Sequence, residues 1–183
     1  MELDLLTDEI DMEIKTKDDY AIVEKEVKNY LNNYVILAKS IINKMQTVNY
    51  KNILTPANIQ KDVPNFTNSL NTISELTKVT EEIDKLVVMT SEEEIMKPME
   101  KQEVADYYKK LYKKIMLGEN STSKLTQISN QLVVSKESLQ SLITKYTNAI
   151  NFLKTNKGKW EISNNQLYFY DTNLANKYNQ IIA

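Results

Sequence analysis

Apolar residues recur every three or four positions along most of the chain, a spacing that places them on one side of an α-helix. The first long series begins after Thr16, which stands three residues before Asp19 in the form of a capping box. This series predicts a helix of about 30 residues, roughly 45 Å long. Its apolar positions are Tyr20, Val23, Val27, Tyr30, Tyr34, Leu37, Ile41 and Val48, with Leu31, Ala38 and Met45 beside them.

Two prolines, Pro56 and Pro64, interrupt the pattern after this helix. Thr55 directly before Pro56 is typical of an N-cap with proline at the first helical position, so we expect a short helix inside the connection. Asn65 is then expected to cap a second long helix. The apolar face of that helix consists of Phe66, Leu70, Ile73, Leu76, Ile83, Leu86 and Val87.

Ser91 and Glu94 form another capping-box pattern, which is expected to open a short acidic turn that Pro98 kinks or ends. The next helix is expected to end at Gly118, in the left-handed conformation that often closes a helix. The apolar stripe that we expect to pack this helix into the core consists of Val104, Tyr108, Leu111 and Ile115.

The longest predicted helix begins at Asn120 or Ser121, extends for about 36 residues, or roughly 54 Å, and is closed by Gly158. Its stripe is Leu125, Ile128, Leu132, Leu139, Leu142, Tyr146, Ala149 and Leu153.

After Gly158 the apolar spacing changes from the helical period to a period of two, which predicts a β-hairpin with a turn at residues 163–166. A two-stranded hairpin is not stable alone, so one of its faces must pack on the helices. The face expected to do so carries Trp160, Ile162, Leu167 and Phe169, while Tyr168 and Tyr170 point outward. Asp171 is expected to cap a final helix bearing Leu174, Tyr178 and Ile181.

These elements predict a mainly α fold: an elongated antiparallel bundle of about four helices, with a small C-terminal β-hairpin and a terminal helix. Residues 1–15 are expected to form an acidic N-terminal arm that is frayed, flexible or weakly docked. Residues 16–183 form a single helical-bundle domain, with the hairpin as an appendage at 159–170.

The amino-acid composition excludes several kinds of catalytic and binding site. The chain has no Cys and no His, and each of its 23 basic residues is Lys. Catalysis by a thiolate or an imidazole, zinc sites of the usual Cys/His kind and bidentate Arg contacts with phosphate are therefore excluded. Only two glycines are present, too few for a glycine-rich phosphate loop. We predict no catalytic residue, no cofactor and no metal ligand, and we expect that the protein is not an enzyme.

Charge and hydropathy limit the partners. The formal net charge is −2 and the isoelectric point is near 5.4, so the chain has no large basic field for nucleic acid, and no nucleic-acid partner is expected. No apolar run approaches the roughly 18 to 20 residues that cross a bilayer, and residues 1–14 do not resemble a signal peptide. We expect contact with a membrane only through a segment outside this chain. The oligomeric state is left open.

Several segments, taken in order, resemble an uncharacterised family of helical proteins from low-GC Gram-positive bacteria. The segments are DYAIVEKEVKNYLNNYVILAKSI, LTPANIQKDVPNF, TSEEEIM, DYYKKLYKKIM, FLKTNKGKWEISNNQLYFY and NKYNQII. The resemblance extends from about Asp19 onward and implies an extracytoplasmic domain tethered by an N-terminal membrane segment or a lipid. Without such an anchor the expected location is the cytoplasm. The family lends no known activity and therefore no functional residues.

Carboxylates are the first candidates for chemistry. Glu92, Glu93 and Glu94 could contribute to a divalent-cation site, but acidic residues at a helix N-terminus also complement the helix dipole, and we favour that interpretation. A pair of carboxylates could in principle hydrolyse a glycosidic bond, although nothing in the sequence brings two of them together.

Tyrosines are the candidates for binding. Tyr107, Tyr108 and Tyr112 share a helix with four lysines (Lys109, Lys110, Lys113 and Lys114), a mixture that could bind a polyanion or an acidic partner. A core stripe with a solvated basic face is the simpler interpretation. The residues we predict for protein contact are Tyr107, Tyr112, Tyr168 and Tyr170.

The function expected from these features is a non-enzymatic interaction or structural domain. The alternative is an intracellular adaptor, chaperone or phage-encoded regulator that binds another protein. A carboxylate-based hydrolase is the remote alternative.

Overall fold

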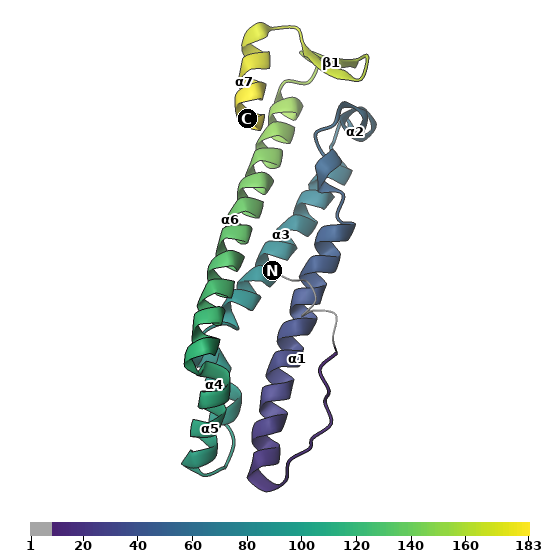
Figure 1. The fold of residues 1–183 in the computed structure, drawn as a ribbon. Helices are drawn as coiled ribbons and strands as arrows, with labels where there is room; N and C mark the ends of the chain where they lie inside the picture. Colours follow the sequence, from purple (N-terminus) through teal and green to yellow (C-terminus); the bar gives the residue numbers. More distant parts are fainter. Residues whose placement is uncertain (1–8) are drawn as a thin grey trace. The chain divides into compact units, whose positions relative to one another are not determined.

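The computed structural model describes residues 9–183, and most of these lie in α-helices (Figure 1). The elements are α1 (Asp18–Thr47), a short 3₁₀ helix η2 (Tyr50–Asn52), α2 (Pro56–Asp62), α3 (Thr67–Val88), α4 (Glu92–Glu100), α5 (Asp106–Leu117), α6 (Glu119–Thr155), β1 (Trp160–Ser163), β2 (Gln166–Phe169) and α7 (Thr172–Ile182). The prediction of a mainly α fold with a small C-terminal hairpin and a terminal helix is confirmed.

The chain divides into two compact units. Unit 1 contains the described residues up to Asn43 together with Glu81–Lys136, and unit 2 contains Lys44–Thr80 together with Glu137–Ala183. Helices α1, α3 and α6 contribute residues to both units, because each boundary falls within a helix. The single domain expected for residues 16–183 remains a prediction.

Three helices begin at the caps that the sequence indicates. The side chains of Thr55 and Ser91 accept hydrogen bonds from the backbone N–H groups of Asn58 and Glu94, and Asp171 caps α7 in the same way. Helix α4 continues through Pro98 to Glu100. These caps are local, because each side chain bonds an N–H two or three residues further on.

The start of α3 corrects one expectation: Asp62 caps this helix, not Asn65. The two carboxylate oxygens of Asp62, the last residue of α2, accept the N–H groups of Asn68 at 2.9 Å and Ser69 at 2.7 Å. Burial raises the pKa of Asp62, but the hydrogen bonds from Ser69 and Asn68 outweigh it and hold the pKa below its ordinary value. Phe66 makes the tight connection with a φ of 57°.

The helix ends at Thr16 and Gly118 also differ from expectation. Thr16 does not cap α1; its hydroxyl donates to Glu24. Gly118 follows α5 with a φ of −60°, so its backbone is not left-handed. A Cβ at this position would lie 2.8 Å from the carbonyl oxygen of Lys114, so close approach explains the glycine better than its conformation does.

The core of unit 1 forms where α4 and α5 pack together with the beginning of α1. Its buried members are Val23, Tyr30, Ile95, Met99, Tyr112 and Met116. The hydroxyl of Tyr112 donates to the carbonyl oxygen of Ile95 at 2.8 Å. The stripe predicted for α5 is therefore rotated: Tyr112 and Met116 are buried, whereas Ile115, which we expected in the core, is 47% exposed.

The core of unit 2 joins the end of α6 to α2, α3, α7 and the hairpin. Its buried members are Ile53, Ile59, Phe66, Ile73, Ala149, Ile150, Leu153 and Tyr178. The residues that the hairpin packs against this core are Trp160, Ile162, Leu167 and Phe169, as predicted. Asn164 and Asn165 form the turn with φ values of 49° and 57°, and the indole N–H of Trp160 donates to the carbonyl oxygen of Leu153 at 2.9 Å.

Candidate interaction surfaces

Three tyrosine rings cluster at the surface of unit 1, where the first turn of α1 meets the first turn of α5. Tyr20 and Tyr108 have ring centroids 5.0 Å apart, Tyr107 and Tyr108 5.2 Å, and Tyr20 and Tyr107 6.4 Å, all with edge-to-face geometry. Tyr20 is 44% exposed and Tyr107 is 59% exposed. The Tyr20 hydroxyl donates to the Tyr107 hydroxyl at 3.4 Å, and this contact raises the pKa of Tyr20.

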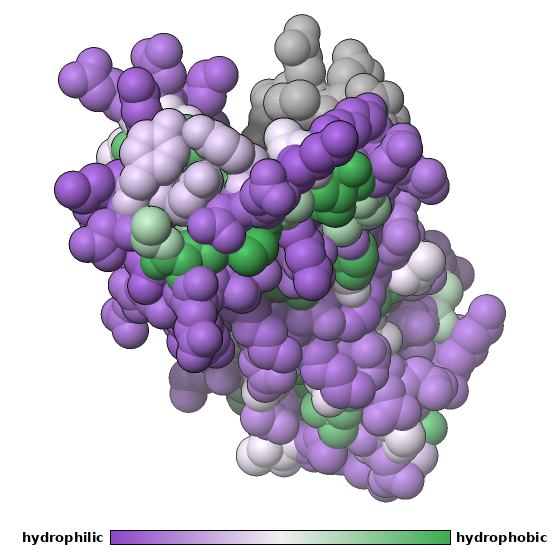
Figure 2. Space-filling view, turned by 90° about the horizontal axis from the view of Figure 1, so that it is seen from below, coloured by the Kyte–Doolittle hydropathy of each residue, from purple (hydrophilic) through white to green (hydrophobic). Residues whose placement is uncertain are grey.

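An apolar groove continues from this cluster between α1 and α5. Val23 and Val27 of α1 and Leu111 and Ile115 of α5 line it, and its volume is about 230 Å³. We call the three tyrosines and these four residues the tyrosine surface. Seen from the end at which α1 begins, hydrophobic side chains are exposed in several groups between hydrophilic ones (Figure 2).

Lysines flank the tyrosine surface on α5. Lys110 and Lys114 are exposed, and their positions three and seven residues after Tyr107 place them on its side of the helix. Lys113, on another side, is paired with Glu92 at 2.6 Å. Within residues 9–183, neither Lys110 nor Lys114 forms an ion pair.

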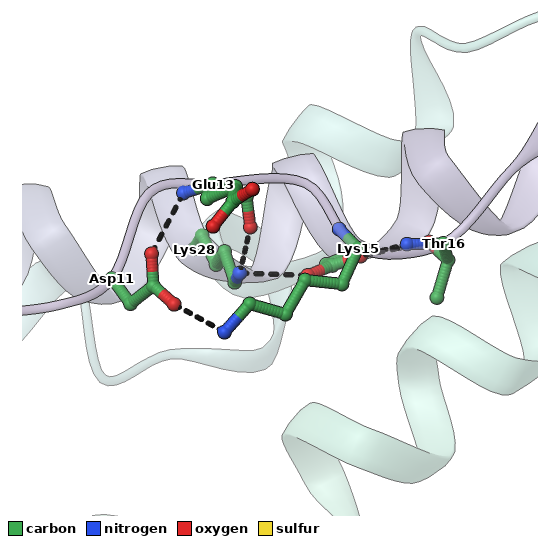
Figure 3. Close-up of polar contacts among 6 residues, drawn as sticks. Asp11, Glu13, Lys15, Thr16 and Lys28 are labelled. Carbon is green, nitrogen blue, oxygen red and sulfur yellow. Dashed lines mark hydrogen bonds and ion pairs between the residues drawn. The ribbon is translucent and has the colours of Figure 1, made fainter.

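The N-terminal arm is attached to α1 beside the groove, at Glu24. Figure 3 shows Asp11, Glu13 and Lys15 of the arm together with Thr16 and with Lys28 of α1. One oxygen of the Glu24 carboxylate accepts the backbone N–H groups of Lys15 and Thr16 and the Thr16 hydroxyl, at 2.9, 2.8 and 2.8 Å. Its other oxygen pairs with Lys28 at 2.6 Å, and Lys28 also donates to the carbonyl oxygen of Glu13 at 2.5 Å. The Lys28 ammonium and the Thr16 donors lower the pKa of Glu24 to about 2.

Part of the predicted weakly docked arm is thus held in place. Asp11 and Lys15 form an ion pair within it, although residues 9–15 have no helix or strand. Residues 1–8 of the predicted arm lie outside the described part of the chain.

A second candidate surface lies on the hairpin of unit 2. Tyr168 is 43% exposed and Tyr170 is 67% exposed. Their hydroxyls donate to nearby side chains, Tyr168 to Gln166 at 2.7 Å and Tyr170 to Glu161 at 3.0 Å. Tyr168 also borders a hollow of about 440 Å³ that Leu54, Leu167, Phe169, Ala175, Tyr178, Asn179 and Ile182 complete.

Of the residues predicted for protein contact, Tyr107, Tyr168 and Tyr170 are at the surface, but Tyr112 is not. The exposed fraction of Tyr112 is 0%, so we correct that prediction: the side chain is a core residue and cannot meet a partner in this structure. Tyr20 was missed, because the apolar stripe of α1 counted it among the core positions. Its place in the first turn, at the open end of that stripe, was the available signal.

Two of the three acidic candidates form ion pairs with nearby lysines. Glu92, Glu93 and Glu94 lie in the first turn of α4, where Glu92 pairs with Lys113 and Glu94 pairs with Lys97 at 2.7 Å. In the part of the chain that the structure describes, no group of three or more acidic residues is arranged to hold a metal ion.

Two further observations bear on the chain as a whole. The helices of residues 9–183 are each too short or too polar to cross a membrane. Comparison of the chain with protein-family models, with curated proteins and with solved structures finds no match.

Proposed function

We propose that the chain is a non-enzymatic binding domain that holds a partner protein through the tyrosine surface. The observation that carries this proposal is the exposed cluster of Tyr20, Tyr107 and Tyr108 beside an apolar groove. Tyrosine is enriched among the residues that dominate binding energy at protein interfaces.

The geometry of the cluster suits binding for a second reason. Each ring contacts both of the others edge to face, so the side chains are already ordered before a partner arrives. Binding then costs less conformational entropy than it would with mobile side chains. The floor of the adjacent groove is apolar, so an apolar side chain of a partner could fill the groove.

A photo-crosslinking experiment in the native cells tests the proposal. Tyr107 is replaced by p-benzoylphenylalanine, and a matched variant carries the same group at Lys25, which is exposed on another side of α1. We expect a discrete crosslinked protein from position 107 that is absent from position 25, and we expect Tyr20→Ala to weaken it.

Other outcomes have equally clear meanings. The same products from both positions, or none from position 107, would contradict the proposal. A third variant with the crosslinker at Tyr170 tests the hairpin surface; a specific product there alone would move the binding function to unit 2.

Because the sequence resembles a family of anchored extracytoplasmic proteins, we also propose that this domain is displayed outside the cell by an anchor encoded upstream of Met1. An adaptor inside the cell is the alternative. Protease treatment of intact cells that carry the tagged native gene separates them, because only a domain outside the membrane is digested while a cytoplasmic marker survives.

A further inference from the structure

We propose that the partner presents an acidic segment to the tyrosine surface, with apolar side chains in the groove and carboxylates beside Lys110 and Lys114. This inference rests on the proposed binding function and names the chemistry of the partner. It follows from the charges around the groove and from the apolar character of its floor.

The charge on the α5 side of the groove is positive, and no acidic side chain among residues 9–183 pairs with it. Lys110 and Lys114 are four residues apart, so they are neighbours on the helix surface and repel each other. Asp106 stands four residues before Lys110, yet no ion pair joins them, and within the described residues Lys114 has no acidic partner either. A carboxylate from outside would relieve this repulsion.

The carboxylate on the α1 side does not offset these lysines. Glu24 lines the groove, but its two oxygens are taken by Lys28, by two backbone N–H groups and by the Thr16 hydroxyl. The rim formed by Glu24 and Lys28 is therefore neutral, and the excess positive charge lies on α5. An acidic partner would be attracted to that side, which also fixes its orientation.

The apolar floor of the groove disfavours a partner that is a polyanion without apolar groups. Val23, Val27, Leu111 and Ile115 line it, and nothing in the described structure covers the exposed part of Ile115. A nucleic acid would satisfy the lysines but would leave this floor in contact with water or bare phosphate. An acidic peptide segment with apolar side chains satisfies both parts of the surface.

The test uses the full chain and a displayed library of short random peptides as the probe. Peptides selected at low salt are labelled and titrated by fluorescence anisotropy. We expect acidic sequences that contain apolar residues. The double variant K110E/K114E should weaken their binding about tenfold or more, because attraction becomes repulsion. Raising the salt from about 0.05 M to about 0.5 M, which shortens the Debye length to about 4 Å, should weaken it similarly.

A matched control carries two charge reversals elsewhere in unit 1. Lys25 and Lys124 are exposed and unpaired among residues 9–183, so K25E/K124E changes the net charge by the same amount away from the groove. We expect this variant to bind nearly as the unchanged protein does. Thermal unfolding followed by circular dichroism verifies that both variants fold.

The outcomes separate this inference from the proposed function. The selected peptides could be neutral or basic and depend on Tyr20 and Tyr107 but not on the two lysines. That result would contradict the proposal of an acidic segment, while the proposed binding surface would stand. A library that yields no peptide dependent on these tyrosines would overturn both. Preferential binding of a single-stranded oligonucleotide through the lysines would identify a nucleic acid instead. Salt-sensitive self-association in sedimentation, lost in K110E/K114E, would identify a second copy of the chain.

Discussion

The carboxylate of Asp62 accepts the backbone N–H of Ser69 at 2.7 Å, so the last residue of α2 supplies the cap of α3. The second oxygen accepts the N–H of Asn68, and the side chain is nearly buried. Two N–H groups that a helix start would leave unpaired are thereby satisfied, and the negative charge lies at the positive end of the helix dipole. One side chain therefore links the end of α2 to the start of α3.

Removal of this cap should destabilise unit 2. We expect Asp62→Ala to lower the free energy of unfolding by about 1 to 2 kcal/mol, since the N–H groups of Asn68 and Ser69 lose their acceptor. Urea denaturation followed by circular dichroism measures the change. Asn65→Ala is the matched control, and we expect it to stay within about 0.5 kcal/mol. A larger loss from Asn65→Ala than from Asp62→Ala would restore the original assignment of the cap.

The difference between Asp62 and Asn65 shows which helix caps can be predicted from the sequence pattern alone. The caps at Thr55, Ser91 and Asp171 could be predicted because each bonds an N–H within three residues, a distance that the sequence alone defines. Asp62 reaches six and seven residues ahead across a turn at Phe66. That contact depends on the path of the backbone, which no local pattern encodes.

The candidate site was less predictable than the fold. Helical spacing fits two overlapping stripes on α5, and the packing of α5 against α4 and the beginning of α1 decides that Tyr112 is buried and Ile115 is exposed. Tyr20 shares the apolar stripe of α1 with core residues, and its place in the first turn was the one sequence signal that set it apart. Alternation in the hairpin left less ambiguity, because a strand has only two faces. Tyr168 and Tyr170 were therefore placed correctly at the surface.

The buried hydroxyl of Tyr112 should contribute to the stability of unit 1. We expect Tyr112→Phe to lower the free energy of unfolding by about 1 kcal/mol, because the hydrogen bond to the Ile95 carbonyl is lost while the ring still fills its place. Chemical denaturation at neutral pH measures this. Tyr107→Phe is the matched control at an exposed position, and an equal loss there would contradict the role of burial.

Alkaline pH provides an independent check on the same side chain. Burial raises the pKa of Tyr112 to about 12 from an ordinary value of 10.0, so the folded state favours the neutral phenol. This contribution to stability is complete below pH 10 and is lost as the pH rises toward 12. We expect Tyr112→Phe to reduce the decline in stability over that window. An unchanged decline would show that Tyr112 ionises as easily in the folded chain as in the unfolded one.

Acid should act on the attachment of the N-terminal arm. Lys28 and Thr16 lower the pKa of Glu24 to about 2 from 4.5, so the folded state favours the carboxylate. The resulting stabilisation is present above pH 4.5 and is lost as the pH falls from 4.5 toward 2. We expect the protection of the Lys15 and Thr16 amide protons, measured by hydrogen exchange relative to the intrinsic exchange rate at each pH, to fall across this window.

Glu24→Gln provides the control for this titration. The amide keeps an oxygen that can accept hydrogen bonds, but it has no charge to lose. We therefore expect lower protection of the Lys15 and Thr16 amides at neutral pH and no further loss of protection between pH 4.5 and 2. An acid-dependent loss of protection that persists in Glu24→Gln would assign the titration to another carboxylate, such as that of Asp11, which pairs with Lys15 inside the arm.

The two faces of the hairpin should respond differently to truncation. Trp160 packs against the core of unit 2 and its indole N–H donates to the Leu153 carbonyl, so we expect Trp160→Ala to cost about 3 kcal/mol. Tyr168→Ala and Tyr170→Ala remove side chains that are 43% and 67% exposed, and each should change stability by less than about 1 kcal/mol. Urea denaturation of the three variants provides the comparison. A loss from Tyr170→Ala as large as that from Trp160→Ala would mean that the assigned faces are reversed.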